Sequence, residues 1–374
     1  MNHFPLKKIY ERQEGAELLE FCSRFEYPKK LYRNIYTYNG VLRSLRDPSF
    51  LAHVLSMKES VQSSSIEGAI TTISDILEAK MENELSETRK RDIIEVLNYE
   101  QAMDYAILEM KDKKDLSEGF IKNIQSILLD STRGYDKRRG DYKIRDNAIG
   151  SRNGDVTYMP PSFMKTKEYM EDLFLYINNA LPIEIDPVIK VAIIHAQFEL
   201  IHPFEDGNGR TGRILIPLLL YKYEVTENPY FYMSNYFAQY RNEYLSSLGK
   251  ISQDNDWSTW IEFFLKGINS QAEYCLKMLD RLENIRREVE KQIMGLKTSF
   301  SIEIVNFLFT KIKFNTPYFI KKTGISESTA KKLLSSLVEV GVISVVLQGS
   351  GKRATQYVFT ELYRIIEEMD NASL

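Results

Sequence analysis

The chain has 374 residues, of which 43% are hydrophobic and 27% are charged, and its formal net charge is -3. This length suggests two or three domains, and the near balance of charge excludes a global attraction to nucleic acid or to acidic membranes. The chain has only two cysteines, Cys22 and Cys275, far apart in sequence and without metal-like spacing, which argues against a disulfide framework and fits a reducing cytosol. No run of eighteen apolar residues is present, so we expect a soluble cytoplasmic protein without a membrane partner.

The first predicted region, residues 1–115, is helical. It contains a helix over about residues 50–68, because Leu51, Val54 and Leu55 follow helical spacing. The helix ends at Glu67-Gly68, since glycine is a common helix end. A carboxylate at a helix C-terminus is unfavourable by a few tenths to about 1 kcal/mol. We therefore expect Glu67 to have a cationic partner elsewhere in the fold.

Residues 140–158 change from a helical to a strand pattern. β-prone residues lie on both sides of Asn153-Gly154, which is the strongest short signal for a hairpin. Because one hairpin among helices is not stable as a sheet, we expect it to lean on the helical body.

A helix predicted over residues 188–201 leads into the most informative stretch, His202-Pro-Phe-Glu-Asp-Gly-Asn-Gly-Arg-Thr-Gly-Arg213. Asp186-Pro187 is a good cap and first position for that helix, which puts His202 at its end. Apolar periodicity resumes after Arg210, so Gly207-Asn208-Gly209 is predicted to be a tight turn that opens a second helix.

The residue types of this stretch favour phosphate chemistry. Free amides at a helix start, together with the helix dipole, bind phosphate, and Arg210 and Arg213 add two guanidinium forks on nearly the same side. Asp206 could hold Mg²⁺, which needs only one or two carboxylates plus phosphate oxygens and waters. A neutral His202 could accept a proton from an attacking hydroxyl. Taken singly, each residue could equally be a cap, a packing residue or a loop residue.

The C-terminal part is predicted to form a linker helix and a small domain. Residues 271–298 form a long helix that would link domains or pair with another helix, which leaves a homodimer open. Residues 299–374 have the order of a small α+β winged helix-turn-helix domain, with a helix at 327–340 and a β-like pair at 342–347 and 355–359. The residues that would read DNA are Ser328, Thr329, Lys331, Lys332, Ser335, Lys352 and Arg353.

DNA binding by this domain stays one of two alternatives. The glutamates Glu327 and Glu339 and a modest basic excess weaken the case for phosphate contacts. The other alternative is a module that docks a protein or dimerises.

The stretch from His202 to Arg213 resembles the signature of the Fic family, His-x-Phe-x-(Asp or Glu)-Gly-Asn-Gly-Arg-x-x-Arg, and matches every specified position. The resemblance implies a mainly α fold with the catalytic core at about residues 116–270. It also implies transfer of AMP from Mg-ATP to a Ser, Thr or Tyr hydroxyl of a target protein or of the chain itself. The implied roles are general base for His202, magnesium ligand for Asp206, support of the transferred phosphate for Asn208, phosphate cradle for Gly207 and Gly209, phosphate clamps for Arg210 and Arg213, and a buried wedge for Phe204.

Two further segments resemble parts of the same family. Ser63-Ser-Ser-Ile-Glu67-Gly68 resembles its inhibitory motif, (Ser or Thr)-x-x-x-Glu-(Gly or Asn), in the class with an N-terminal inhibitory helix. This implies that Glu67 pairs with Arg213 and keeps ATP from seating productively; the alternative is a solvated glutamate at a frayed helix end. The hairpin resembles the family's flap, which adds the target chain as a strand, and makes Arg145 and Tyr158 candidate docking residues. The alternative is a purely structural hairpin.

The chain departs from the family near the adenine base, where many relatives carry two adjacent tyrosines and this chain has Tyr244-Leu245. Tyr244 would either stack on the base or belong to the core, so base selectivity stays open. Two other functions also remain. One is removal of AMP by the same site, with Glu67 positioning water. The other is a transcription regulator whose helical body senses a nucleotide.

Overall fold

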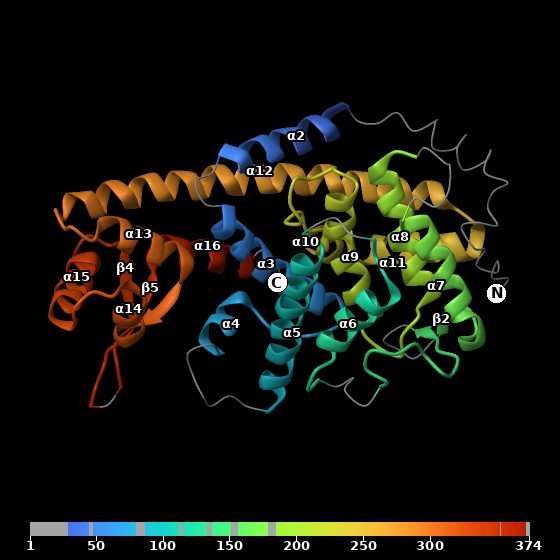
Figure 1. Cartoon of the computed structure of the whole chain (residues 1–374), viewed down its shortest axis with the longest axis horizontal. Helices are drawn as coiled ribbons and strands as arrows, with labels where there is room; N and C mark the ends of the chain where they lie inside the picture. Colours follow the sequence, from blue (N-terminus) through green and yellow to red (C-terminus); the bar gives the residue numbers. More distant parts are fainter. Residues whose placement is uncertain are drawn as a thin grey trace. The chain divides into compact units, whose positions relative to one another are not determined.

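The computed structural model describes residues 29–44, 48–79, 87–111, 115–132, 137–150, 156–178, 185–351 and 353–371. Most of these residues are helical, which confirms the predicted mainly α fold class (Figure 1). The chain divides into two compact units, one of residues 1–44, 55–70 and 90–276 and one of residues 45–54, 71–89 and 277–374. Among the described residues, no helix is both long enough and apolar enough to cross a membrane.

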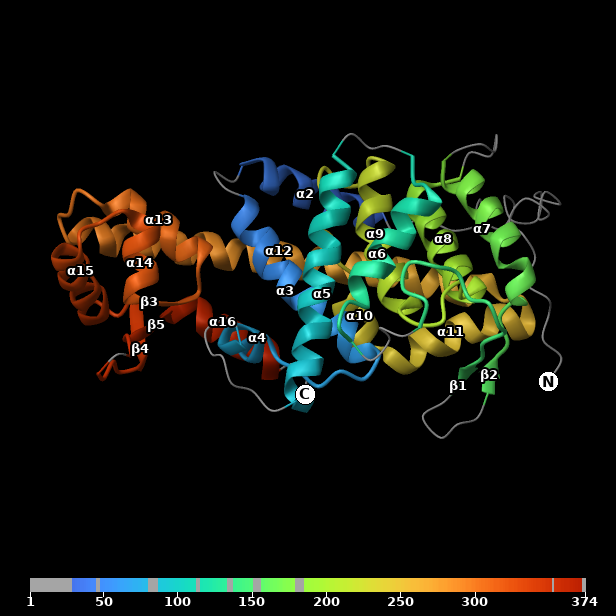
Figure 2. The same ribbon diagram turned by 60° about the horizontal axis from the view of Figure 1, so that its bottom comes forward.

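The first unit is built of helices and one short hairpin. Its helices are α2 (Lys29–Ser44), most of α3 (Pro48–Ile66), most of α5 (Glu87–Glu109), α6 (Glu118–Leu128), α7 (Phe163–Ile177), α8 (Pro187–Ile201), α9 (Asn208–Lys222), α10 (Ser234–Gln239), α11 (Arg241–Asp254) and the first half of α12 (Trp257–Gly295). The hairpin pairs β1 (Ile149–Gly150) with β2 (Val156–Tyr158) in antiparallel register (Figure 2). Its predicted turn, Asn153-Gly154, lies outside the described residues.

Helix α8 is the central helix of this unit. Every residue from Val188 to Ile201 is buried except Lys190, so α8 is covered on all sides rather than on the one face that the periodicity predicted. It packs against α7 on one side and α9 on the other. The indole of Trp260 from α12 donates a hydrogen bond to the carbonyl oxygen of Ala192 over 2.9 Å. The core therefore fixes the residue that follows α8, which is His202.

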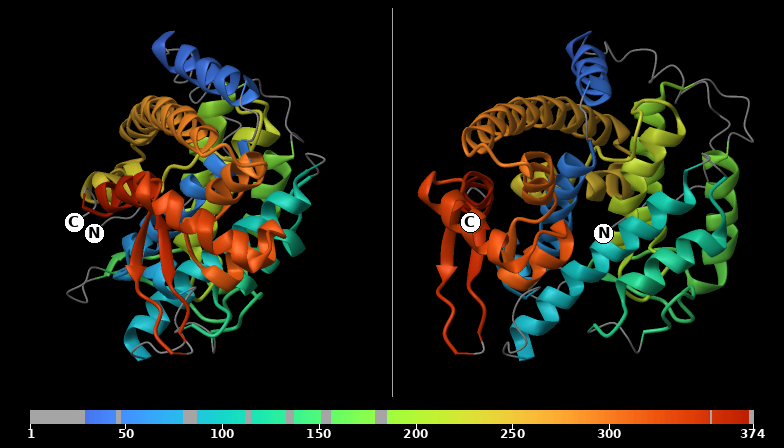
Figure 3. Two further views of the ribbon diagram at one scale, coloured as in Figure 1. Left: turned by 90° about the vertical axis from the view of Figure 1, so that its left-hand side faces the viewer. Right: turned by 60° about the vertical axis from the view of Figure 1, so that its left-hand side comes forward.

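The second unit holds a three-stranded antiparallel sheet with helices around it (Figure 3). Its elements are α4 (Ile73–Ala79), the second half of α12, α13 (Ser301–Thr310), β3 (Lys313–Asn315), α14 (Thr316–Thr323), α15 (Glu327–Glu339), β4 (Ile343–Leu347), β5 (Gln356–Phe359) and α16 (Thr360–Asn371). The strand order is β3-β5-β4. The predicted helix at 327–340 and the β-like pair are present, whereas β3 and α16 were not predicted. The winged-helix assignment stays a prediction, and Lys352 lies outside the described residues.

The N-terminal cap of α8 offers a test of this arrangement. Asp186 Oδ1 accepts hydrogen bonds from the amides of Val188 over 2.8 Å and Ile189 over 3.3 Å. We expect Asp186→Ala to lower the free energy of unfolding by about 1 to 2 kcal/mol, because the helix loses its cap. Asp186→Asn keeps an acceptor oxygen and should lose much less. Urea unfolding of both variants would measure this, and an equal loss in the two would contradict the capping role.

Candidate active site

His202 ends α8 in a left-handed conformation, with φ of 49°. Non-glycine residues rarely adopt this conformation, and where they do, it often marks a functional position. The ring Nδ1 donates a hydrogen bond to the carbonyl oxygen of Glu199 over 3.3 Å, so Nε2 is the nitrogen that can accept a proton. Burial lowers the pKa of His202 to about 4, which keeps the imidazole neutral at pH 7. The imidazole is thus neutral, and its Nε2 carries the lone pair that can accept a proton.

The loop after His202 is held by two residues that sequence reasoning missed. The Lys143 amide donates to the carbonyl oxygen of Pro203 over 2.9 Å, and Lys143 Nζ donates to that of Ile201 over 3.3 Å. Asn147 Nδ2 donates to the carbonyl oxygens of His202 over 3.3 Å and Phe204 over 3.0 Å. These partners are backbone groups far along the chain, so the sequence around Lys143 and Asn147 carries no signal for them.

Asn208 closes the same loop from the other end. Its Oδ1 accepts from the Phe204 amide and its Nδ2 donates to the Phe204 carbonyl oxygen, both over 2.8 Å. Phe204 is fully buried, with its ring 5.6 Å from that of Tyr142 and 6.5 Å from that of Phe198, centroid to centroid. Phe204 is thus buried, as expected of the residue predicted to be a wedge under the loop. The side-chain amide of Asn208 therefore makes its hydrogen bonds within the loop and fixes the turn.

Asp206 lies at the entrance to α9. Its Oδ1 accepts from the Gly207 amide over 2.6 Å and lies 3.6 Å from Arg210 Nη2, while its Oδ2 lies 3.2 Å from Lys137 Nζ. Gly207, with φ of 79°, is the turn residue that starts α9. Gln125 steadies this turn, because its Nε2 donates to the carbonyl oxygen of Asp206 over 3.0 Å.

The donor set around Asp206 fits a cation that completes its own shell with phosphate and water. No group of three His, Cys, Asp or Glu side chains able to cage a metal occurs among the residues described. A single half-exposed carboxylate is what Mg²⁺ uses when a nucleotide supplies the other oxygens, whereas zinc sites need three or four protein ligands.

Arg210 is a buried guanidinium with incomplete hydrogen bonding. Its side chain is 6% exposed and its Nη1 lies 3.6 Å from Glu95 Oε2. Within the described residues, Arg210 Nε and Nη1 have no hydrogen-bond partner. Because an unsatisfied buried donor is costly, an anion entering the site would gain these bonds.

Arg213 is fully enclosed by the end of α3. Its Nε donates to Ser63 Oγ over 2.8 Å, and its Nη2 donates to the Ser63 carbonyl oxygen over 3.0 Å and to Glu67 Oε1 over 2.7 Å. The Arg213 side chain is 1% exposed and that of Glu67 is 42% exposed. The predicted cationic partner of Glu67 is therefore Arg213. Gly68, with φ of 102°, ends the helix as predicted.

The Glu67 carboxylate also lies against the first turn of α9. A Cβ atom on Gly209 would overlap Glu67 Oε1, so only glycine leaves room for the carboxylate here. Burial raises the pKa of Glu67, but the charge and hydrogen bond of Arg213 outweigh it and bring the pKa below its ordinary value. Glu67 is thus ionised at neutral pH.

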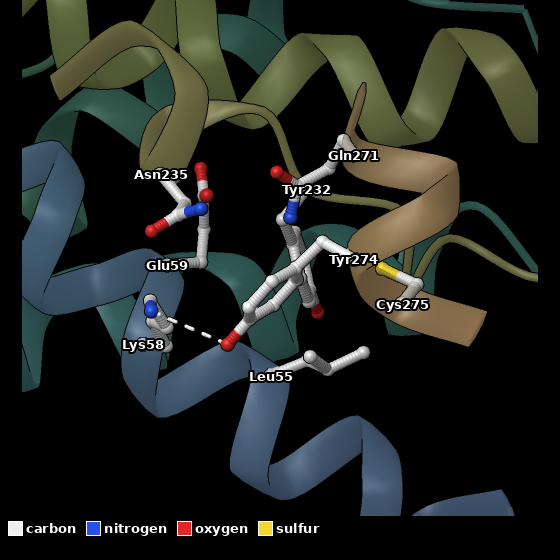
Figure 4. A pocket seen from close by; sticks show the side chains of 8 residues that line it. All are labelled: Leu55, Lys58, Glu59, Tyr232, Asn235, Gln271, Tyr274 and Cys275. Carbon is white, nitrogen blue, oxygen red and sulfur yellow. Dashed lines mark hydrogen bonds between the residues drawn. The ribbon is translucent and has the colours of Figure 1, made fainter. Parts of the chain in front are cut away.

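One face of α3 is fixed by Glu59, two turns before Glu67. Tyr99 Oη donates to Glu59 Oε1 over 2.9 Å, and the Ser234 amide donates to Oε2 over 3.0 Å. Glu59 also borders a small hollow, where Lys58 Nζ donates to Tyr274 Oη over 3.2 Å (Figure 4). Because positions four apart share a helix face, this anchor directs Ser63 and Glu67 toward Arg213.

Tyr244 belongs to the core, which corrects its expected place at an adenine base. It is 2% exposed, its ring stacks on Phe237 with centroids 4.4 Å apart, and its Oη is hydrogen-bonded to His195 Nε2 over 3.0 Å. Trp260 belongs to the same aromatic cluster, with its ring centroid 6.0 Å from that of Tyr244. This is the second of the two alternatives that the sequence left open.

The two hairpin candidates differ in exposure. Tyr158 is 6% exposed and its Oη donates to the carbonyl oxygen of Leu200 over 3.0 Å, so it anchors β2 to α8 instead of facing a target. Arg145 is exposed, and its Nη2 lies 3.2 Å from Glu205 Oε2. Only Arg145 remains a candidate for docking.

Comparison with known proteins agrees with this geometry. Residues 32–108 match the N-terminal region of the Fic/DOC family, and residues 115–220 match the Fic/DOC family. Protein adenylyltransferase fic-1 of Caenorhabditis elegans is 37% identical over 67 residues, which are 18% of this chain and 13% of that protein. Protein adenylyltransferase Fic of Drosophila melanogaster is 27% identical over 192 residues, which are 50% of this chain and 35% of that protein. Most of the length of these relatives therefore lies outside the matched regions.

Solved structures of similar fold extend the match over more of the chain. A Fic family protein from Desulfovibrio desulfuricans G20 has 18% identity and a TM-score of 0.56, covering 90% of this chain and 97% of that one. A Fic domain containing signaling protein from Bacteroides thetaiotaomicron VPI-5482 has 20% identity and a TM-score of 0.53, covering 67% of this chain and 97% of that one. With two adjoining family regions and the signature folded between α8 and α9, the chain belongs to the Fic/DOC family.

Proposed function

We propose that the protein transfers AMP from Mg-ATP to a Ser, Thr or Tyr hydroxyl of a protein, either a target or itself, and that Glu67 holds this activity in check. The observation that carries the proposal is the ion pair of Arg213 with Glu67, seated on the first turn of α9 and one loop away from the neutral His202. The adenylyltransferase names of the relatives support the same reaction type.

The chemistry follows from the positions of the side chains. The attacking hydroxyl gives its proton to His202 Nε2 while its oxygen forms a bond to the α-phosphorus, and the bond from that phosphorus to the bridging oxygen breaks, releasing pyrophosphate. The amides at the start of α9 and the open donors of Arg210 stabilise the negative charge that builds up on the phosphate oxygens. Such transfers require little covalent chemistry from the protein, so catalysis rests mainly on positioning and charge stabilisation.

Asp206 is the residue that would hold Mg²⁺, together with phosphate oxygens of the nucleotide and water. When bound, the ion would neutralise charge on the phosphates. Lys137, 3.2 Å from Asp206 Oδ2, supplies a positive charge next to this carboxylate.

Glu67 would inhibit by occupying the guanidinium and the space that the outer phosphates of ATP need. Its carboxylate takes up Nη2 of Arg213, the proposed clamp for the outer phosphates, and fills the space above Gly209. A phosphate brought to the same place would meet an ionised carboxylate at short range, which is electrostatically unfavourable. Removal of AMP, with Glu67 positioning water, uses the same groups and is the second outcome to look for.

Target docking by the hairpin and DNA binding by the C-terminal unit have less support than the transfer reaction. The hairpin of β1 and β2 could add a target strand beside the exposed Arg145. In α15, Lys331 is paired with Glu327 over 2.7 Å, which reduces the basic surface available to DNA. We therefore give DNA binding and homodimerisation no part in the proposed function.

The proposed transfer is tested with ATP labelled at the α-phosphate. We expect strong labelling of protein by Glu67→Gly, weak labelling by the wild type, and a loss of at least about 100-fold in Glu67→Gly/His202→Ala, because the base is gone. Gel autoradiography and mass spectrometry would measure the label. Absence of label in Glu67→Gly, with ATP binding shown by calorimetry and a panel of cell extracts as acceptors, would contradict the proposal. Release of AMP from a labelled acceptor by the wild type would favour AMP removal.

The loop anchor provides a second test. In the Glu67→Gly background we expect Asn147→Ala to slow transfer about 10- to 100-fold, because the loop carrying His202 loses two hydrogen bonds and small displacements are costly. The matched control is Asn123→Ala, since Asn123 Nδ2 donates to Tyr105 Oη over 3.0 Å at the exposed surface of α6. Initial rates of labelling would compare the two, and equal rates would refute the anchoring role.

A further inference from the structure

We propose that Tyr99 and Glu59 are positioning residues of the inhibition, because their buried hydrogen bond fixes α3 two turns before Glu67 and so keeps Glu67 on Arg213. The strength of the inhibition then depends on the Tyr99 hydroxyl. This inference rests on the proposed function, because it concerns how the inhibitory carboxylate is held in place. Neither residue belongs to the signature or to the inhibitory motif.

Glu59 is tied to two other helices. Its side chain lies inside the protein, and the residue is 2% exposed. Its Oε1 accepts hydrogen bonds from Tyr99 Oη over 2.9 Å and from Ser234 Oγ over 2.6 Å, and its Oε2 accepts from the Ser234 amide over 3.0 Å. Because a buried carboxylate is costly without such bonds, this point of α3 is fixed to α5, which carries Tyr99, and to α10, which begins at Ser234.

The Tyr99 hydroxyl extends this anchor toward the active site. Tyr99 is fully buried and gives its one proton to Glu59. The same hydroxyl is hydrogen-bonded to Ser63, one turn further along α3, so Ser63 is the donor in that bond. Ser63 Oγ accepts in turn from Arg213 Nε over 2.8 Å. Polar contacts thus lead without a break from Arg213 to Glu59.

The position of α3 at Glu59 affects Glu67 because the helix between them is continuous. Glu59, Ser63 and Glu67 follow one another four residues apart, so they are neighbours on one side of the helix. The distance from the first to the last is about 12 Å along the helix axis. The carbonyl oxygen of Ile66 also accepts from Arg241 Nε over 3.2 Å. Loss of the anchor should therefore weaken the hold on Glu67 without abolishing it.

The experiment removes the Tyr99 hydroxyl and keeps the ring, in Tyr99→Phe. With ATP labelled at the α-phosphate, we expect the initial rate of AMP transfer to rise about 3- to 10-fold over the wild type, which is the factor expected for the loss of one hydrogen bond. In the Glu67→Gly background the same substitution should give no rise, because no inhibitory carboxylate is left to release.

Two further variants show whether the effect belongs to this anchor. The matched control is Tyr38→Phe, because Tyr38 is as fully buried as Tyr99 but its Oη donates to the carbonyl oxygen of Tyr230 over 3.0 Å. It should leave the rate unchanged in both backgrounds. Ser234→Ala removes the hydroxyl that donates to Glu59 from α10, and it should raise the wild-type rate even if Tyr99→Phe folds poorly.

The outcomes separate this inference from the proposed function. A merely structural role of Tyr99 would lower the rate in both backgrounds. That result, an unchanged wild-type rate, or an equal rise with and without Glu67 would overturn the inference and leave the proposed function in place. If Glu67→Gly transfers no AMP, the proposed function fails, and dissociation constants for Mg-ATP from calorimetry then test the anchor alone. Tighter binding by Tyr99→Phe than by the wild type would support the inference, and equal binding would overturn it.

Discussion

The buried guanidinium of Arg213 is the constraint on which the site depends. A charge enclosed to this extent must be paired and hydrogen-bonded, because leaving it bare costs several kcal/mol. Arg213 meets this need with Ser63 and Glu67, which both come from the end of α3. The end of α3 is therefore required by the charge on α9. The inhibitory motif and the signature are thus connected by one buried charge, because Ser63 and Arg213 lie 150 residues apart in the chain and are hydrogen-bonded.

The sequence predicted the site wherever residue type and spacing decide the outcome. The turn at Gly207, the end of the helix at Gly68 and the need of Glu67 for a cation all follow from local rules of helix ends and dipoles. They required no knowledge of the tertiary structure. The mainly α fold class was implied by the resemblance to the Fic family, and the apolar periodicity of the single helices agreed with it.

Side-chain partners at long range could not be predicted. Asn147 binds carbonyl oxygens 55 and 57 residues away, and these bonds depend on how two loops meet. Tyr244 and Tyr158 look alike as aromatic candidates for a site, yet both hydroxyls bind buried partners on α8, so both belong to the core.

The exposure of Glu67 sets how much its contact with Arg213 contributes, and a contact of intermediate strength is what the proposed inhibition requires. Removing one member of a fully buried ion pair costs about 3 to 5 kcal/mol, whereas an exposed pair contributes about 0 to 1 kcal/mol. Here Arg213 is enclosed but Glu67 is 42% exposed, so the pair lies between these limits. Water can replace Glu67 more easily than it can replace Arg213, and Glu67 ends a helix at a glycine, where few other contacts must break. Glu67 is therefore the partner that solvent reaches, and Arg213 is the partner that the core encloses.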